Sequence, residues 1–189
     1  MEQSNQQPPM FNQQGVQLTE ERPIMGFKEA VRTCFAKYAT FTGRARRSEY
    51  WWFCLFMALL SMVCSIFDGI LKAACNVEFV ETLASLFVLV PSISVSFRRL
   101  HDIGRSGWWA GASYILCAIS VIIVLFMTGF DFSLLTDGES LYHTLSKSDK
   151  VIAVLPMLGG LVVCLIVFVF SLMDSQLEEN KYGPSPKYQ

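Results

Sequence analysis

The chain has 189 residues, of which 52% are hydrophobic and only 16% are charged, and its mean hydropathy is +0.40. This composition excludes an ordinary soluble domain of that length and indicates an integral membrane protein. The formal net charge of −1 carries little information, because the charges are segregated along the chain. We expect no nucleic-acid partner.

The N-terminal segment is polar, rich in glutamine and contains two consecutive prolines. It has no apolar core of the kind that a cleavable signal peptide requires. Residues 1–22 are therefore predicted to form a disordered tail.

An amphipathic helix is predicted over residues 23–41. Apolar side chains recur there at helical spacing from Phe27 to Tyr38, while charged side chains such as Lys28 and Arg32 fall on the other side. Because this segment leads into a membrane span, we expect it to lie flat in the interface. The alternative is a small helix that packs on the cytoplasmic loops.

Four segments can each hold a membrane helix, at about residues 50–70, 79–97, 106–130 and 151–173. A hydrocarbon core of ~30 Å requires roughly 20 helical residues. The second segment is marginal, because it contains Pro91 and reaches full length only if Glu81 lies among the headgroups. A buried or re-entrant helix is the alternative for that segment.

The distribution of lysine and arginine favours four crossings. With four spans, twelve of the fifteen cations fall on one side of the membrane and three on the other. The positive-inside rule then predicts that both termini are cytoplasmic. The sequence thus predicts an all-α integral membrane protein: a four-transmembrane-helix bundle with an N-terminal interfacial amphipathic helix, a membrane domain over 23–176 and a cytoplasmic tail over 177–189.

Two arginine clusters, each followed by tryptophans, abut these spans on the predicted cytoplasmic side, within residues 43–52 and 98–109. If the second span continues past residue 97, Asp102 lies at helical spacing from both Arg98 and Arg99 and can pair with either. The candidate ligand-binding residues are Arg44, Arg46, Arg47, Arg98, Arg99, His101, Asp102, Arg105 and Trp108.

Three interpretations of these clusters remain open, in decreasing order of preference. The arginines fix the topology while the tryptophans anchor the helices, with no ligand. Alternatively, guanidinium groups bind a phosphate. In the third, His101 is an acid–base catalyst oriented by Asp102, although adjacent side chains diverge on a helix. No metal centre and no cofactor are expected, because the other histidine, His143, belongs to the opposite side.

Three ordered motifs carry a family resemblance. They are FxGRxRRxxYW at residues 41–51, RRLHDxGRSGWW at 98–109 and NKYGPxP at 180–186. Together they resemble a bacterial inner-membrane family known as domain of unknown function 805, over about residues 23–187. The resemblance implies a small multi-span protein of the bacterial cytoplasmic membrane, and it implies no reaction, cofactor or ligand.

The C-terminal tail has two interpretations. It either folds back on the arginine clusters, with Glu178 and Glu179 as partners, or it is solvated and disordered. The motif at 180–186 predicts a turn before Pro184.

The function that the sequence favours is that of a non-catalytic structural or binding protein. Its cytoplasmic-facing arginine and tryptophan site would bind anionic lipid headgroups or a phosphorylated ligand. The alternative is a membrane-embedded enzyme that acts on a lipid headgroup with His101 and Asp102, and the third candidate is a small transporter subunit. The expected partners are membrane lipids, with a second copy or other membrane proteins as further candidates.

Overall fold

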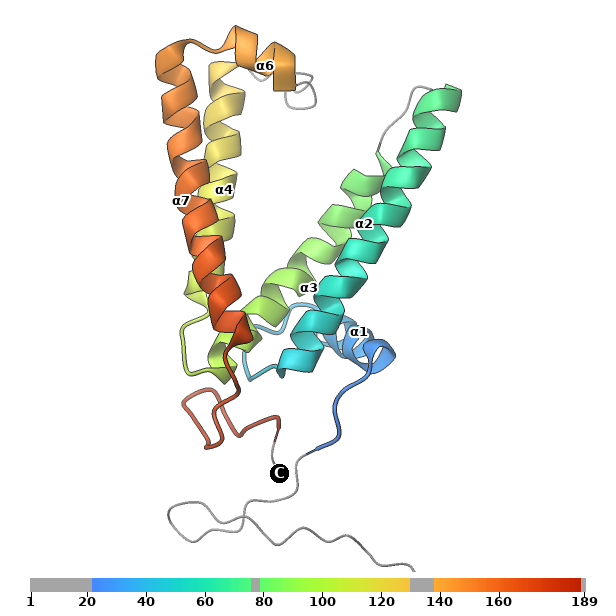
Figure 1. Cartoon of the computed structure of the whole chain (residues 1–189), viewed down its shortest axis with the longest axis vertical. Coiled ribbons are helices and arrows are strands. Elements are labelled where there is room, and N and C mark those ends of the chain that lie inside the picture. Colours follow the sequence, from blue (N-terminus) through green and yellow to red (C-terminus); the bar gives the residue numbers. More distant parts are fainter. Residues whose placement is uncertain (1–21, 76–78, 130–137, 188–189) are drawn as a thin grey trace, which may run out of the picture. The chain divides into compact units, whose positions relative to one another are not determined.

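The computed structural model describes residues 22–75, 79–129 and 138–187. Every named element in these residues is a helix (Figure 1), so the predicted all-α class is confirmed. The chain separates into two compact units, and unit 2, residues 106–173, is inserted between the two segments of unit 1. Unit 1 comprises the residues up to Arg105 and those from Asp174 onwards.

Four helices of the described residues are long and apolar enough to cross a membrane, as predicted. They are α2 (Arg47–Cys75), α3 (Val80–Asp102), α4 (Trp108–Met127) and α7 (Lys147–Leu172). The second span, which looked marginal, is 23 residues long because its helix continues through the arginines to Asp102. At 1.5 Å per residue this is roughly 34 Å, enough to cross the hydrocarbon core.

The predicted N-terminal helix is present as α1 (Phe27–Ala36), shorter than the expected range 23–41. It begins only after Gly26, which has an extended backbone and is the N-cap. Its last residue is Ala36, and Lys37 is the C-cap. Its apolar stripe contacts the membrane helices of unit 1, because Phe35 lies 5.7 Å from the ring of Phe56 on α2 and 5.7 Å from that of Phe87 on α3. The charged face of α1 remains exposed.

Pro91 explains how α1 is fixed to α3. Proline has no N–H, so the carbonyl of Phe87, four residues earlier, loses its helical donor. The Tyr38 hydroxyl donates to this carbonyl at 2.6 Å. One turn further along α3, the Ser94 hydroxyl donates to the carbonyl of Thr40 at 2.7 Å. The segment that follows α1 therefore satisfies the backbone group that proline leaves without a partner, and an unsatisfied group of this kind is costly in lipid.

The opposite end of unit 1 is closed by Asp68 of α2. Its carboxylate accepts hydrogen bonds from the backbone N–H groups of Val80 at 2.9 Å and Glu81 at 2.8 Å. These N–H groups belong to the first turn of α3 and have no acceptor within the helix. Asp68 thus caps α3 and fixes the register of the two antiparallel helices.

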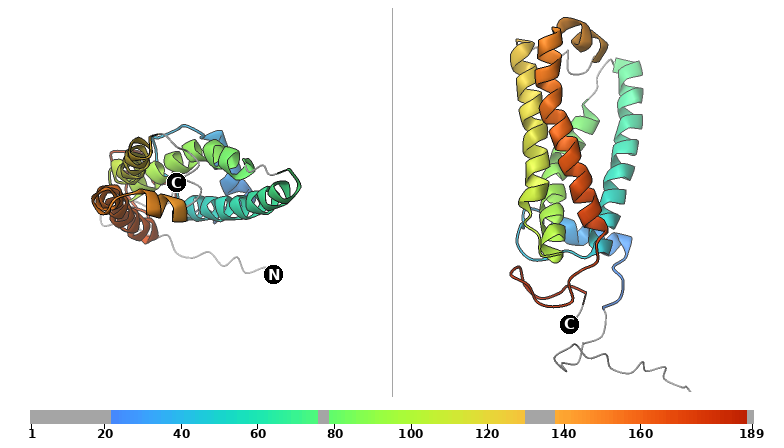
Figure 2. Two further views of the ribbon diagram at one scale, coloured as in Figure 1. Left: turned by 90° about the horizontal axis from the view of Figure 1, so that it is seen from above. Right: turned by 60° about the vertical axis from the view of Figure 1, so that its left-hand side comes forward.

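Unit 2 contains α4, α6 (Gly138–Thr144) and α7. Helices α4 and α7 run side by side in both views (Figures 1 and 2). Gly160 permits a close approach, because a Cβ atom there would lie 3.3 Å from Cys117 Sγ on α4. Near the start of α4 and the end of α7, the rings of Trp109 and Phe170 make an edge contact at 6.2 Å.

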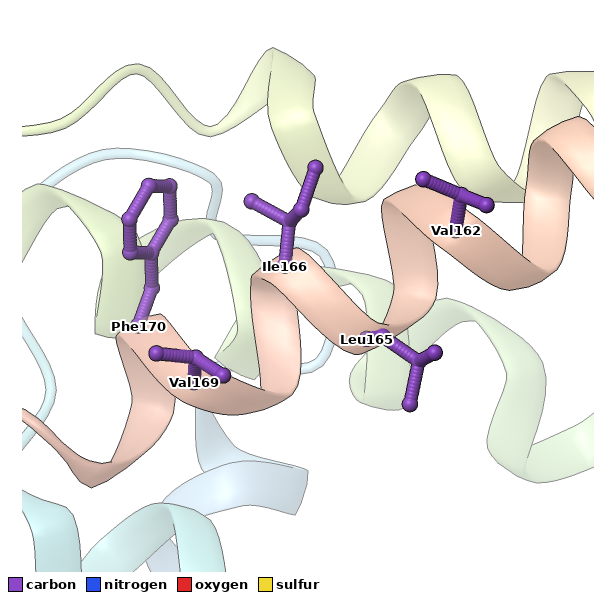
Figure 3. Close-up of a pocket in the computed structure, with 5 residues that line it drawn as sticks. All are labelled: Val162, Leu165, Ile166, Val169 and Phe170. Atoms are coloured by element: carbon purple, nitrogen blue, oxygen red, sulfur yellow. The ribbon is translucent and has the colours of Figure 1, made fainter.

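A shallow hollow of about 380 Å³ lies along α7 within unit 2 (Figure 3). All of its lining side chains are apolar and come from this one helix: Val162, Leu165, Ile166, Val169 and Phe170. It contains no group that could bind or transform a polar ligand, and its apolar lining matches lipid chains.

Candidate functional site

The arginine-rich turn that precedes α2 and the arginine-rich last turn of α3 meet at one end of unit 1. The backbone N–H of Ala45 donates to the carbonyl of Arg98 at 2.9 Å, which joins the two motifs directly. Gly43 (φ +82°) and Gly104 (φ +75°) adopt left-handed conformations that other residues disfavour. Both motifs therefore need their glycine where the chain reverses.

Asp102 is the centre of the cluster. Its Oδ1 accepts from Arg44 Nε at 2.9 Å, and its Oδ2 accepts from Arg99 Nη1 at 2.6 Å and from the Ser175 hydroxyl. The side chains of Arg44 and Arg99 are 1% exposed and that of Asp102 is fully buried. The pairing of Arg99 with Asp102 is one of the two that the helical spacing permits.

Arg98 has a different partner, Glu49 of α2, although its spacing also allowed Asp102. The two side chains form a buried ion pair, 1% and 4% exposed. The Cys34 thiol of α1 donates to Glu49 Oε1 at 3.9 Å. Burial, followed by the charge of Glu49, raises the pKa of Cys34 to about 12, so this thiol stays protonated and unreactive.

Arg44 also holds the C-terminal tail. Its Nη1 donates to the carbonyls of Glu178 at 2.9 Å and Gly183 at 3.2 Å, and its Nη2 donates to the carbonyl of Gln176. The tail therefore folds back, and Glu178, one of the two expected partners, contacts Arg44 through its backbone. The acceptors are backbone carbonyls, whereas the side chains of Glu178 and Glu179 belong to exposed residues.

The NKYGP motif forms the turn that lies over His101. Asn180 and Gly183 exchange two backbone hydrogen bonds, and Gly183 has a φ of +118°. The Asn180 amide donates to the carbonyl of His101 at 3.0 Å. The Tyr182 ring stacks on the imidazole of His101, with centroids 3.7 Å apart and planes 8° apart.

Gly104 has a second reason to be glycine. The side chain of Gln176 lies directly over it, and a Cβ atom at this position would be 2.7 Å from Gln176 Nε2. The backbone N–H of Gln176 also donates to the carbonyl of Asp102 at 3.1 Å. The tail thus packs closely against the end of α3.

His101 and Asp102 do not act on each other. His101 Nδ1 lies 3.2 Å from the carbonyl of Gly43, which makes Nδ1 a protonated nitrogen that donates to this carbonyl. Both carboxylate oxygens of Asp102 are occupied by arginines and Ser175. Among the residues that the structure describes, no carboxylate bonds to the imidazole of His101.

The remaining candidates lie nearer the surface. Arg46 donates to the carbonyls of Pro23 and Arg22 at 2.9 and 3.0 Å. Arg47 is exposed and lies 3.6 Å from Asp174, and Arg105 is also exposed. Trp108 opens α4 and belongs to unit 2.

Asp174 begins the tail segment of unit 1. The backbone N–H of Ser175 donates to its carboxylate at 2.9 Å, and Lys187 lies 3.8 Å away. This hydrogen bond, followed by the charges of Lys187 and Arg47, lowers the pKa of Asp174.

Sequence reasoning did not assign a site role to several residues that build the cluster. They are Cys34, Glu49, Ser175, Gln176, Asn180, Tyr182 and Gly183. A signal existed for Glu49, because it is an acidic residue at the start of a long apolar span. Among the described residues, no group of three histidine, cysteine or acidic side chains could hold a metal ion.

Residues 38–184 match the family described as "Protein of unknown function (DUF805)". The chain belongs to this family. The DUF805 match begins at Tyr38, two residues after the end of α1, and ends at Pro184 in the tail. It therefore includes both arginine motifs and the turn that covers His101.

The relatives of this DUF805 chain include two proteins of Escherichia coli K12. Inner membrane protein YhaH is 30% identical over 152 residues, which cover 79% of this chain and 89% of YhaH. Inner membrane protein YhaI is 35% identical over 92 residues, which cover 48% of this chain and 76% of YhaI. No solved structure matches the chain. Together with the four apolar helices, these relatives identify a multi-span protein of the inner-membrane type.

Proposed function

We propose that this protein is a non-catalytic membrane protein that binds anionic lipid headgroups through exposed cations of unit 1. The supporting observation is that cations and aromatic anchors occur together there. Phe27 of α1 makes an edge contact with Trp52 of α2 at 5.9 Å, and Lys28 and Arg32 lie on the exposed face of the same short helix. Tryptophan favours the headgroup layer, and each cation near an anionic surface contributes roughly 1 kcal/mol.

The buried arginines are not part of this headgroup surface. Arg44, Arg98 and Arg99 are held by carboxylates and carbonyls inside unit 1. Headgroup contact therefore falls to exposed cations such as Lys28, Arg32, Arg47 and Arg105. The candidate surface is thus partly different from the arginine set that the sequence suggested.

The proposed orientation has both termini in the cytoplasm. It is supported by the asymmetry of twelve cations against three, which the positive-inside rule converts into a topology. Reporter proteins fused after Cys75 and after Ser140 should both be located outside the cytoplasm. A cytoplasmic signal from either fusion would contradict the orientation.

The binding role is preferred over the enzyme that uses His101 and Asp102. A general base needs an orienting partner and access to substrate. Here Asp102 neutralises two arginines and the face of His101 is covered by Tyr182. No observation favours the transporter alternative.

Lipid retention tests the proposal. The full-length Lys28→Gln/Arg32→Gln variant, purified in a neutral detergent, should retain several-fold less phosphatidylglycerol relative to phosphatidylcholine than the wild type. The matched control, Lys72→Gln/Lys150→Gln, removes two positive charges from the opposite ends of the spans and should retain as much as the wild type. Equal retention by all three proteins would refute headgroup binding by α1.

A further inference from the structure

Arg98 is buried in unit 1 with part of its guanidinium group unsatisfied. Its side chain is 1% exposed, and its Nη1 donates to Glu49 Oε1 of α2. Its other two nitrogens, Nε and Nη2, are also buried, and neither donates to any residue that the structure describes. Burying an N–H donor without an acceptor is costly, so an acceptor is expected on this side of Arg98.

The two unsatisfied nitrogens form one edge of the guanidinium group. The Nε–H and one Nη2–H of an arginine lie in one plane and point to the same side, so both can donate to a single acceptor. Arg44 uses this same edge on Asp102, where Nε donates to Oδ1 at 2.9 Å and Nη2 donates to the backbone carbonyl at 3.2 Å. The corresponding edge of Arg98 has no acceptor among the described residues.

The side chains around this edge are poor acceptors. The buried Cys34 thiol of α1 lies close enough for the charge of Arg98 to act on it, but it donates to Glu49, and its sulfur is a weak acceptor. Phe53 lies one turn along α2 from Glu49 and is fully buried. Val95 lies one turn along α3 from Arg98 and is fully buried as well. A small polar ligand therefore fits this edge better than a rearranged side chain does.

Charge and position favour water as that ligand. Glu49 already neutralises Arg98, so an anion would bring an uncompensated negative charge into the buried site. The hydrogen bonds from Arg98 and Cys34 both end on Glu49 Oε1, and no residue of the described ranges donates to Oε2. A buried water typically makes about three hydrogen bonds, two of which this edge provides. Arg98 is four residues, or about 6 Å, from the end of α3, where water is available.

We propose that unit 1 binds a buried water molecule at Arg98, between α1, α2 and α3. The water accepts from Nε and Nη2 of Arg98 and donates to the carboxylate of Glu49. It thereby satisfies the donors that the ion pair leaves over and becomes part of the contact between the three helices. The exposed cations of α1 take no part in this site, so it does not depend on headgroup binding.

Nuclear magnetic resonance of the full-length wild type in neutral micelles tests for the water. Once the Nε–H signals are assigned through the backbone, a bound water should give a cross-peak to the Nε–H of Arg98. Arg44 is the matched control, because its side chain is equally buried but its Nε donates to Asp102. It should give no such cross-peak. The absence of the cross-peak at Arg98, or equal cross-peaks at both arginines, would overturn the proposal.

A titration of the same sample separates water from an anion. When gluconate is replaced by chloride at constant ionic strength, the Nε–H signal of Arg98 should not shift, because a neutral ligand occupies the edge. A saturable shift with chloride would identify an anion site and would also overturn the proposal.

The Lys28→Gln/Arg32→Gln variant distinguishes this site from the headgroup surface. It should keep the cross-peak between water and Arg98 at the wild-type intensity, whatever its lipid retention. Loss of the cross-peak in this variant would contradict the separate location of the water.

Discussion

Unit 1 and unit 2 each contain a pair of membrane-spanning helices, but different contacts hold each pair together. Helices α2 and α3 bury the ion pair of Glu49 and Arg98 and the cluster around Asp102. Among the described residues of unit 2, the buried side chains are uncharged, and α4 approaches α7 at Gly160. Buried charges specify their partners strongly, because a mispaired charge is costly, whereas apolar contacts tolerate repacking.

The largest effect should come from the centre of the charged cluster. Asp102→Asn leaves Arg44 and Arg99 without a counter-charge and should lower the free energy of unfolding by about 3–5 kcal/mol. The matched change in unit 2 is Asp149→Asn, which weakens only the capping box of α7 and should cost about 1 kcal/mol. Thermal unfolding in detergent measures both, and equal losses would contradict the contrast between the units.

Gly104, in the turn that follows α3, should be the next most sensitive position. Gly104→Ala places a side chain at a φ of +75° and against Gln176, which should destabilise unit 1 by about 1–2 kcal/mol. Gly69→Ala, inside α2 with no atom within 4 Å of the new Cβ, should be neutral or stabilising. An equal response of the two variants in the same unfolding assay would count against the role of the turn.

The contact between Tyr38 and Phe87 should give a smaller effect that depends on Pro91. Tyr38→Phe leaves the carbonyl of Phe87 without a donor and should cost about 1 kcal/mol. In the Pro91→Ala background, residue 91 regains its N–H and can satisfy that carbonyl. The effect of Tyr38→Phe should then nearly vanish, which a double-mutant cycle measures directly. Additive losses would contradict this explanation of the proline.

The smallest effect is expected at the exposed start of the tail. Asp174→Asn should cost less than about 1 kcal/mol, since its pairs with Arg47 and Lys187 are solvated. The pKa of Asp174 is lowered in the folded state, so its contribution is present at neutral pH and is lost as the pH falls through that lowered pKa. Wild type and variant should therefore converge in stability at acid pH, and a gap that persists there would contradict this assignment.

Much of the fold could be predicted from the sequence, because the relevant signals are local. Runs of apolar residues gave all four spans, and the continuation of helix past residue 97 allowed the pair of Arg99 with Asp102 to be expected. The ends of α1 were less predictable, because the extended backbone of Gly26, which delays the start of the helix, leaves no signal in the apolar pattern. That α1 packs on α2 and α3 depends on aromatic contacts between distant segments.

The candidate site was predictable in location but not in its internal pairing. The motifs indicated that the arginines gather at the ends of two helices, and Ala45 does bond to the carbonyl of Arg98. The spacing could not distinguish Asp102 from Glu49 as the partner of Arg98, because Glu49 is 49 residues away. Glu178 was expected as a partner of the arginines, but the sequence did not show that its backbone carbonyl would be the acceptor.

The sequence by itself determined that this is a four-span helical membrane protein with two arginine motifs at the ends of its first two spans. Hydrophobic length and charge segregation suffice for that conclusion, since the bilayer selects for both. Only the tertiary structure decided which arginines are buried and that the tail lies over Arg44. Every residue has a backbone carbonyl, so the sequence does not show which carbonyls accept hydrogen bonds from Arg44. Only the folded chain decides that.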